Sequence, residues 1–347
     1  MVNKIFKKNI LFICPFFHDY PQIIKNALLE LGANEVYLEP LKLHGETRRE
    51  SPSSSVLLTI IKWLKNPLYR RNWTQKVINN IENKQVDILF CIGGYPYTKS
   101  LINILKNKNP YLASYLFLWD SLSFYDYSEY VSLFDYAFSF DKDDCAKINE
   151  LEYLPDFYIK HNDLHQKKIY DFTYIGTINN MNFEERYNCL RKISEQLNSN
   201  RWHCYLHAYI PQLKYSTKTY IQEIFNPLHR RYRKFIGCIS NSNFTSTKHL
   251  SIDDVIQIQS QSKCIIDISY GNRQGLTMHC IDAIANGIKL ITTNEHIKHE
   301  PFYHPNNILI IDKENPIIDM EFLDKPVIPV DIKYLRLDNW LKYIINR

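Results

Sequence analysis

Residues 263–294 hold the polar side chains whose types and spacing best suit the binding of a charged ligand. The pattern predicts a strand, a tight loop, a short helix and a second strand. Thr277 is suited to begin the helix, because its hydroxyl can accept from a free amide of the first turn, and Gly287 is suited to end it. A loop that enters a helix at the carboxyl end of a parallel strand is a natural anion site. Asp282 lies one turn into this helix, so a phosphate on the amides and a hydroxylated ring on the carboxylate would together suit a nucleotide.

Residues 274–287 resemble the nucleotide-sugar signature of GT-B glycosyltransferases. In that signature an acidic residue, seven spacers and a second acidic residue lead into a helix of small residues that ends in glycine. Here Gln274 holds the first acidic position and Asp282 the second, and the sequence IDAIANG matches the end of the signature. Gln274 departs from the pattern, since its amide can hydrogen-bond a sugar hydroxyl but carries no charge. The resemblance implies that the donor is also contacted by Gly275, Leu276 and Thr277. The alternative is an ordinary loop and helix of an α/β domain.

A second polar loop follows Gly176 and Thr177 and leads into another predicted helix. In GT-B proteins the equivalent loop approaches the donor diphosphate with glycine amides, and a nearby basic residue adds charge. Arg186 and Arg273 are the candidates for that residue, because the planar guanidinium pairs well with phosphate oxygens. The alternative for Arg186 is a solvent-facing helix position paired with Glu185 or its neighbours.

The residues that could act as a catalytic base follow predicted strands of the N-terminal half. An inverting transfer needs a group that removes the proton of the acceptor hydroxyl. His18 and Asp19 follow the first strand, and Asp120 follows a later one. Each has a simpler interpretation: Asp19 as a helix N-cap, Asp120 as a turn cap, and His18 as a loop residue or acceptor contact. Gly93 would let the backbone approach a ligand or a helix closely.

The sequence predicts no metal site and no cofactor. The acidic run Asp141–Asp144 contains aspartates two apart, but it begins a predicted helix, where negative charge favours the positive end of the dipole. GT-B enzymes usually offset the charge of the leaving group with amides and basic side chains.

Composition indicates the compartment. The 42 basic and 37 acidic residues leave a net charge of +5, which supports an anionic ligand only weakly. The eight cysteines form no C-x-x-C pair, which is typical of a reducing cytoplasm. No run reaches the roughly 18 apolar residues that a membrane span needs.

Strand and helix patterns alternate through both halves, which predicts parallel sheets covered by helices. We therefore expect an α/β protein with two Rossmann-like domains facing across a cleft, as in the GT-B fold. Residues 1–155 would form the acceptor domain and residues 165–330 the nucleotide-sugar donor domain, joined by a linker near 153–163. The amphipathic C-terminal helix, within 331–347, could pack back on the first domain. The predicted strands are Asn9–Cys14, Glu35–Leu38, Asp87–Ile92, Tyr115–Trp119, Tyr136–Phe140, Phe172–Ile175, His203–Tyr209, Cys264–Ile268, Ile288–Thr292 and Ile308–Ile311.

Two clusters combine basic and aromatic residues, Lys62–Lys76 and Arg230–Lys234. Such clusters can lie on an anionic membrane surface, or they can be solvated helix faces. No recognition motif for nucleic acid accompanies them, so we expect no nucleic-acid partner.

The function that these patterns favour is a metal-independent glycosyltransferase. It would move a sugar from a nucleotide sugar to a glycan or lipid-linked glycan, in the assembly of bacterial surface polysaccharide or lipopolysaccharide. It would be cytoplasmic, with peripheral contact to the inner face of the membrane through the basic clusters. Two alternatives remain: a nucleotide-sugar epimerase on the same fold, and a non-catalytic protein that binds polyanions or membranes. The donor sugar, its nucleotide, the linkage, the stereochemical course and the oligomeric state stay open.

Overall fold

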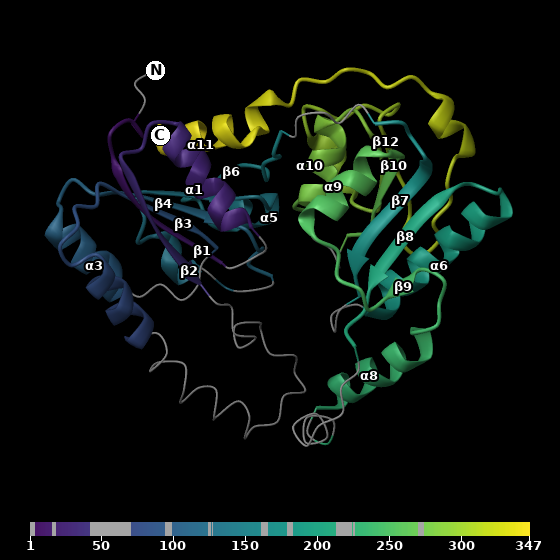
Figure 1. Cartoon of the computed structure of the whole chain (residues 1–347), viewed down its shortest axis with the longest axis horizontal. Helices are drawn as coiled ribbons and strands as arrows, with labels where there is room; N and C mark the ends of the chain where they lie inside the picture. The colour runs from purple at the N-terminus through teal and green to yellow at the C-terminus, as the bar shows by residue number, and fades with distance from the viewer. Residues whose placement is uncertain are drawn as a thin grey trace. The chain divides into compact units, whose positions relative to one another are not determined.

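The computed structural model divides into two compact units, Met1–Phe157 with Tyr334–Arg347, and Tyr158–Lys333 (Figure 1). The residues that it describes are 4–15, 19–41, 71–93, 99–123, 126, 128–160, 166–178, 183–212, 224, 226–269 and 274–347.

The first unit is built on a six-stranded sheet with the strand order β2-β1-β3-β4-β5-β6, in which every pairing is parallel. All five residues of β3 are buried, because helices cover a parallel sheet on both faces. Its strands are β1 (Asn9–Pro15), β2 (Glu35–Leu41), β3 (Ile88–Ile92), β4 (Ala113–Leu118), β5 (Tyr136–Ser139) and β6 (Leu151–Tyr153).

The helices of the first unit include the last helix of the chain. Trp340 of this helix is fully buried; its ring meets that of Phe117 edge-on at 4.7 Å, and its indole nitrogen donates to the Pro155 carbonyl at 3.0 Å. Tyr115 of β4 donates its hydroxyl to the Ile345 carbonyl at 2.9 Å. The chain therefore returns to its first unit to complete that unit's core. The described helices are α1 (Tyr20–Glu30), α3 (Lys99–Lys108), α4 (Ser128–Val131), α5 (Lys142–Lys147) and α11 (Leu337–Ile345).

The second unit also has a six-stranded sheet with parallel pairings, in the order β12-β11-β10-β7-β8-β9. Counted from β7, the strands follow the order 3-2-1-4-5-6 of mononucleotide-binding sheets. The direction of strand addition reverses between β7 and β10, and ligands of such sheets bind at this switch point. The strands are β7 (Tyr170–Thr177), β8 (Cys204–Tyr209), β9 (Thr245–Ser246), β10 (Ser262–Asp267), β11 (Lys289–Thr292) and β12 (Ile308–Ile310).

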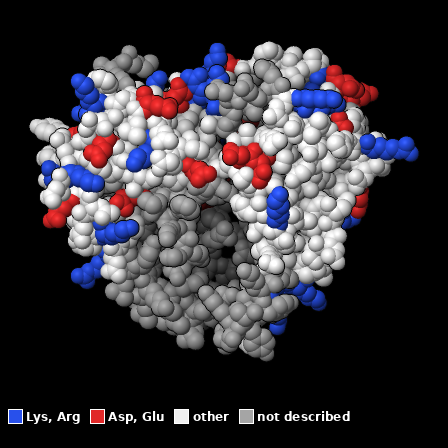
Figure 2. All heavy atoms as spheres, viewed as in Figure 1, with Lys and Arg blue, Asp and Glu red and all other residues white. Residues whose placement is uncertain are grey.

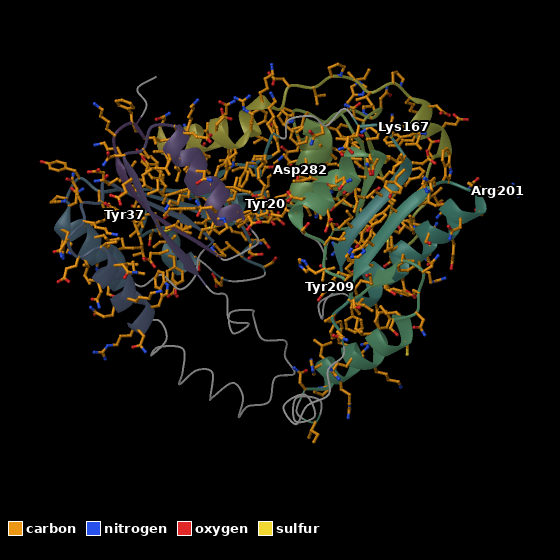
Figure 3. The ribbon with its side chains drawn as sticks, viewed as in Figure 1. Tyr20, Tyr37, Lys167, Arg201, Tyr209 and Asp282 are labelled. Atoms are coloured by element: carbon orange, nitrogen blue, oxygen red, sulfur yellow. The ribbon has the colours of Figure 1, made fainter. Side chains whose placement is uncertain are left out.

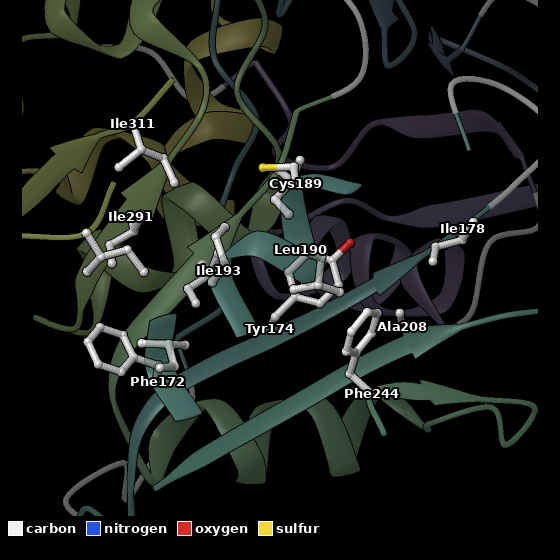
Figure 4. Close-up of a cluster of buried hydrophobic side chains, with 14 of the residues drawn as sticks. Phe172, Tyr174, Ile178, Cys189, Leu190, Ile193, Ala208, Phe244, Ile291 and Ile311 are labelled. Carbon is white, nitrogen blue, oxygen red and sulfur yellow. The ribbon is translucent and has the colours of Figure 1, made fainter. Parts of the chain in front are cut away.

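The core of the second unit lies between this sheet and its helices. Leu190 and Ile193 on one face of α6 pack with Phe172 and Tyr174 of β7 and Ala208 of β8 (Figure 4). The spacing of the buried residues along α6 follows the helical repeat, which is why this polar sequence forms a helix against the sheet. The helices are α6 (Phe183–Ser199), α8 (Pro227–Ile239), α9 (Ile252–Ser260) and α10 (Met278–Ala285), with short 3-10 helices at Glu295–His299, Met320–Asp324 and Lys333–Leu335.

These observations confirm the predicted fold class and the strands predicted from sequence. Two strands were not predicted, β6 and β9, because three and two residues are too few to show a periodic pattern. No helix among the described residues is long and apolar enough to cross a membrane.

Candidate functional site

The candidate site lies at the switch point of the second sheet, where β7 and β10 end side by side. The two strands are parallel neighbours, with Ile266 opposite Tyr174, so their carboxyl ends meet at one edge. The helix α10 begins close to this edge, with Thr277 as its N-cap. The predicted cap is therefore confirmed, as is Gly287 beyond the end of the helix, which has a φ of 62°. Amides at such a helix start attract negative charge.

Arg186 ties the two strand ends together. Its Nε donates to the Ile268 carbonyl at 3.0 Å, its second terminal nitrogen donates to the same oxygen, and its first donates to the Thr177 carbonyl at 3.0 Å. The side chain is buried, with 7% exposed. The solvent-facing alternative is therefore wrong, and Glu185 pairs instead with Lys313 at 2.9 Å. Arg186 fixes the distance between the loops after β7 and β10; its contact with phosphate stays a prediction.

Gly176 fits this crowded strand end because it has no side chain. A Cβ at this position would come within 2.5 Å of the Tyr174 hydroxyl, closer than two such atoms can approach. Thr177 is the last residue of β7, and its carbonyl is the one that Arg186 holds. Both residues lie where the sequence places them, and their contact with a donor stays a prediction.

Asp267, the last residue of β10, anchors the start of α10. One carboxylate oxygen accepts from the Thr277 hydroxyl at 2.9 Å, and the other accepts from the Thr292 hydroxyl at 3.1 Å. The side chain is buried, with 5% exposed. Asp267 was not among the residues predicted to form the site, although an aspartate that follows the apolar run Cys264–Ile266 is a signal that could have found it. It fixes the helix start relative to the sheet.

Asn294 orients the turn that precedes α10. Its side-chain nitrogen donates to the carbonyls of Gln274 and Gly275, at 3.2 and 3.1 Å. In a trans peptide the N–H points opposite to the C=O, so the amides of Gly275 and Leu276 point away from Asn294. Within the described ranges neither amide donates to a protein oxygen. The turn therefore presents two successive N–H donors, a common way of holding a phosphate.

Asp282, which is labelled on α10 in Figure 3, lines a small hollow between α9 and α10. No hydrogen bond to its carboxylate is formed by any residue that the structure describes, and burial raises the pKa of the carboxyl to about 7. The hollow has a volume of about 20 Å³, room for one water-sized group such as a hydroxyl. The other lining residues are Ile256, Gln259, Ser260, Ile265, Asn286 and Ile288. A carboxylate that has no partner in the described part of the chain, beside an opening of this size, suits a ligand hydroxyl.

His279 is a further polar residue of α10, and it was not predicted from sequence to belong to the site. Its Nδ1 lies 3.2 Å from the side-chain nitrogen of Gln259 on α9. Burial lowers the pKa of the imidazole; Arg186 lowers it further, whereas Asp267 acts in the opposite direction.

In the first unit, the carboxyl ends of β1 and β3 also form a switch point. Gly93 has a φ of +69°, and its amide donates to the Phe117 carbonyl at 2.8 Å. A Cβ on it would approach Pro15 to 3.0 Å. The missing side chain of Gly93 therefore allows its backbone to lie close to the end of β1.

The candidate bases lie along the same edge of the first sheet. Asp19 occupies the N-cap position of α1, but its side chain makes no capping hydrogen bond, so the capping interpretation is not supported. Asp120 lies two residues beyond β4 and is partly buried. The rings of the adjacent residues Tyr20 and Trp119 meet edge-on with centroids 5.6 Å apart. The structure thus brings Asp19 and Asp120 into one region, whereas His18 lies outside the described residues, as does Arg273.

Asp144 supports the loop that carries Asp120. It is 1% exposed, and its Oδ2 accepts from the Leu122 amide at 2.8 Å. Burial raises the pKa of this carboxyl to about 6. The acidic run in which it lies begins α5 as predicted, with Asp141 as the N-cap. Sequence alone gave no sign that Asp144 reaches a different loop.

The basic cluster Arg230–Lys234 is less exposed to solvent than its sequence suggests. Arg233 is buried, with 9% exposed, and Arg231 pairs with Glu184. Arg230 and Lys234 are exposed. On the face drawn in Figure 2, basic and acidic side chains are interspersed among the described residues. Residues 62–70 of the other cluster lie outside the described part of the chain.

Comparison with known proteins gives a fold but no family. No protein-family model matches the chain, and no curated protein sequence matches it. Among solved structures it is similar to UDP-GlcNAc 2-epimerase from Neisseria meningitidis bound to UDP-GlcNAc, with a TM-score of 0.58, 10% identity, and 98% of this chain and 100% of that chain covered. The N-terminal domain of Candida albicans trehalose-6-phosphate phosphatase gives a TM-score of 0.56 at 10% identity, covering 98% and 96%.

A UDP-GlcNAc 2-epimerase from Methanocaldococcus jannaschii, in complex with UDP-GlcNAc and UDP, gives a TM-score of 0.51 at 9% identity, covering 97% and 99%. Likeness at this level of identity shows the fold alone. The chain is a two-unit α/β protein with a GT-B-like fold.

Proposed function

We propose that the protein binds a nucleotide sugar at the switch point of its second unit and transfers the sugar to an acceptor held by its first unit. The observation that carries the proposal is the turn before α10. Its carbonyls are held by Asn294, and Asp282 lies one turn into the helix. Among the described residues, the amides of Gly275 and Leu276 have no acceptor and the Asp282 carboxylate has no hydrogen-bond donor. Together these are two donors for a diphosphate and an acceptor for ribose hydroxyls.

In this proposal each named residue has one task. The amides of the turn and the start of α10 bind the diphosphate and stabilise the charge that develops on it as the sugar leaves. Gln274 hydrogen-bonds the donor sugar, and Gly176 and Thr177 approach the diphosphate from the neighbouring strand end. Arg186 holds that strand end in place, and Arg273 adds positive charge. No metal or other cofactor is assigned a role.

The chemistry would be displacement at the anomeric carbon. The acceptor oxygen forms a bond to that carbon, the bond to the diphosphate breaks, and a carboxylate takes the proton of the acceptor hydroxyl. Asp120 and Asp19 are the proposed carboxylates, with His18 as a third candidate. The acceptor would be a glycan or lipid-linked glycan of a bacterial surface polysaccharide or lipopolysaccharide. The reaction would take place in the cytoplasm, with the exposed residues Arg230 and Lys234 toward the inner face of the membrane.

A second candidate function is epimerisation of a nucleotide sugar. It is favoured by the similarity to two UDP-GlcNAc 2-epimerases over nearly the whole length of the chain. The two functions differ in their need for an acceptor. An epimerase converts UDP-GlcNAc alone and, in deuterium oxide, places deuterium at the carbon that it inverts. A transferase releases UDP in proportion to the acceptor that it consumes. Proton NMR of UDP-GlcNAc incubated with the protein, with and without acceptor, separates them.

The binding proposal is tested by thermal unfolding with uridine, guanosine, cytidine and thymidine diphosphates. A nucleotide at about 100 times its Kd should stabilise the protein by roughly 2.7 kcal/mol. Asp282→Ala and Gln274→Ala should lose the response of the parent. The control is Asp253→Ala, which removes an exposed carboxylate from α9 and should respond like the parent. The proposal is wrong if no nucleotide stabilises the parent, or if both site variants respond as it does. Binding of anionic vesicles that persists in Asp282→Ala, without any nucleotide response, would instead support the non-catalytic alternative.

A further inference from the structure

The large hydrophobic side chains that the first unit exposes gather at one edge of its sheet. Among its described residues, all of them except Tyr334 lie at the edge where the parallel strands begin. Figure 1 shows both ends of the chain and the end of α1 at this edge, which we call the Phe6 edge. It is opposite to the edge at which Asp19 and Asp120 lie. The exposed side chains are Phe6 before β1, Leu29 in the last turn of α1, Tyr111 before β4, Tyr136 at the start of β5 and Tyr343 in the last turn of α11.

Phe6 is held at the surface by a tight turn, residues 4–7. The preceding residue, Ile5, is fully buried, whereas 57% of Phe6 is exposed. Lys7 has a φ of 56°, which is uncommon for a residue other than glycine, and its amide donates to the Gly32 carbonyl at 2.8 Å. A Cβ on Gly32 would come within 2.9 Å of the Phe6 ring, so the ring rests on the backbone of the turn between α1 and β2. The fold therefore presents this aromatic ring to solvent in a fixed position.

Positive charge is concentrated around the Phe6 ring. Lys4, Lys7 and Lys8 are exposed, and no carboxylate in the described part of the chain pairs with them. The ammonium group of Lys7 lies 5.3 Å from the centroid of the ring. Glu30, the last residue of α1, is an exposed carboxylate of the same edge, so the lysines of the turn outnumber it. Farther along the edge, basic groups are neutralised in the ion pairs Lys106–Asp135 and Arg347–Glu152.

This combination of groups suits the surface of an anionic membrane. Lipid phosphates attract lysines close to the surface, and an exposed aromatic ring gains free energy when it leaves water for the boundary of the acyl chains. Tyrosines such as Tyr111 and Tyr136 are enriched at the level of the head groups, where the ring is apolar and the hydroxyl is hydrated. A soluble polyanion would contact the lysines but would leave the apolar rings in water, so lipid fits the surface better.

We propose that the Phe6 edge docks on an anionic membrane, with the Phe6 ring between the lipids and the lysines of its turn on their phosphate groups. This surface is separate from the basic cluster Arg230–Lys234, which belongs to the second unit, and from the proposed nucleotide site. The proposal goes beyond the proposed function and does not depend on it.

The test is co-sedimentation of the protein with phosphatidylcholine vesicles, made with and without phosphatidylglycerol. The parent should bind the anionic vesicles more tightly than the neutral ones, and the binding should weaken as salt is added. Phe6→Ser should lower the partition coefficient about tenfold, because the burial of the ring is lost. Lys7→Gln and Lys8→Gln should each lower it about fivefold. The control is Ile317→Ser, which removes an exposed apolar side chain from the second unit and should bind like the parent.

Two further measurements complete the test. Thermal unfolding without vesicles shows whether Phe6→Ser is folded like the parent, and the two lysine variants decide the question if it is not. Vesicle binding that is lost in the double variant Arg230→Gln/Lys234→Gln but kept in Phe6→Ser would refute the proposal, as would a parent that binds no vesicle. If the parent binds no vesicle and light scattering shows a smaller mass for Phe6→Ser than for the parent, the edge is instead a contact between two copies of the chain. None of these outcomes depends on nucleotide binding, so a failure here leaves the proposed function in place.

Discussion

Replacing Asp282 with asparagine should stabilise the free protein while abolishing its response to nucleotide. The pKa of this carboxyl rises from its ordinary value of 3.8 to about 7 because the surrounding protein desolvates it, and no described residue pairs with it. A pKa shift of one corresponds to a free-energy difference of about 1.4 kcal/mol between the two protonation states. The ionised carboxylate therefore costs the folded protein up to about 4 kcal/mol at pH 8. Asparagine has nearly the same shape and carries no charge, so it avoids this cost.

The sign of the pH dependence follows from proton linkage. The folded protein holds the Asp282 proton more tightly than the unfolded chain does. The stabilising contribution is therefore complete below pH 4 and is lost as the pH rises through 7. The difference in the free energy of unfolding between Asp282→Asn and the parent should be small near pH 4 and grow to its maximum by pH 8.

Urea unfolding of both proteins between pH 4.5 and 8 measures this difference in the free energy of unfolding. The exposed carboxylate of Asp253 supplies the control, since Asp253→Asn should show no such trend. A gain in stability together with a loss of binding is expected of a carboxylate kept for a ligand. An advantage that is independent of pH, or a variant less stable than the parent at pH 8, would refute the reasoning.

Three other substitutions test the supports of the two sheet edges. Arg186→Met removes three hydrogen bonds to two backbone carbonyls, of which that of Ile268 is buried, and should lower the free energy of unfolding by about 3 kcal/mol in urea titrations. Asn294→Ala releases the two carbonyls of the turn, and calorimetry should show weaker nucleotide binding with a stability loss of about 1–3 kcal/mol. Asp144→Ala leaves the Leu122 amide without its acceptor, so hydrogen exchange at that amide should accelerate. Nucleotide affinity should stay that of the parent, and a change in affinity would contradict the separate roles of the two units.

The parts of the fold that depend on local pattern could be predicted from the sequence. Apolar runs gave the strands, and Thr277 and Gly287 gave the ends of α10, because a cap and a positive φ are set by nearby residues. The turn before α10 was recognised for the same reason, since its residues are consecutive.

The supports of the site could not be predicted, because they join residues that are distant in the chain. Arg186 was expected to face solvent or phosphate, yet its guanidinium holds a carbonyl 82 residues away. Asn294 contacts the turn from the loop after β11, and Gln259 contacts the ring of His279 from another helix. None of these side chains differs in type from an ordinary surface residue, so only the packing of the elements reveals its role. Asp267 is the exception, since its place at the end of an apolar strand could have been noticed.

A crystal structure of the protein with a bound nucleotide sugar would show whether the ligand occupies the switch point of the second sheet. We predict diphosphate oxygens within hydrogen-bond distance of the amides of Gly275 and Leu276, and a ribose hydroxyl on the carboxylate of Asp282. A nucleotide bound at another sheet edge, with those two amides bonded to protein oxygens and Asp282 untouched, would contradict it.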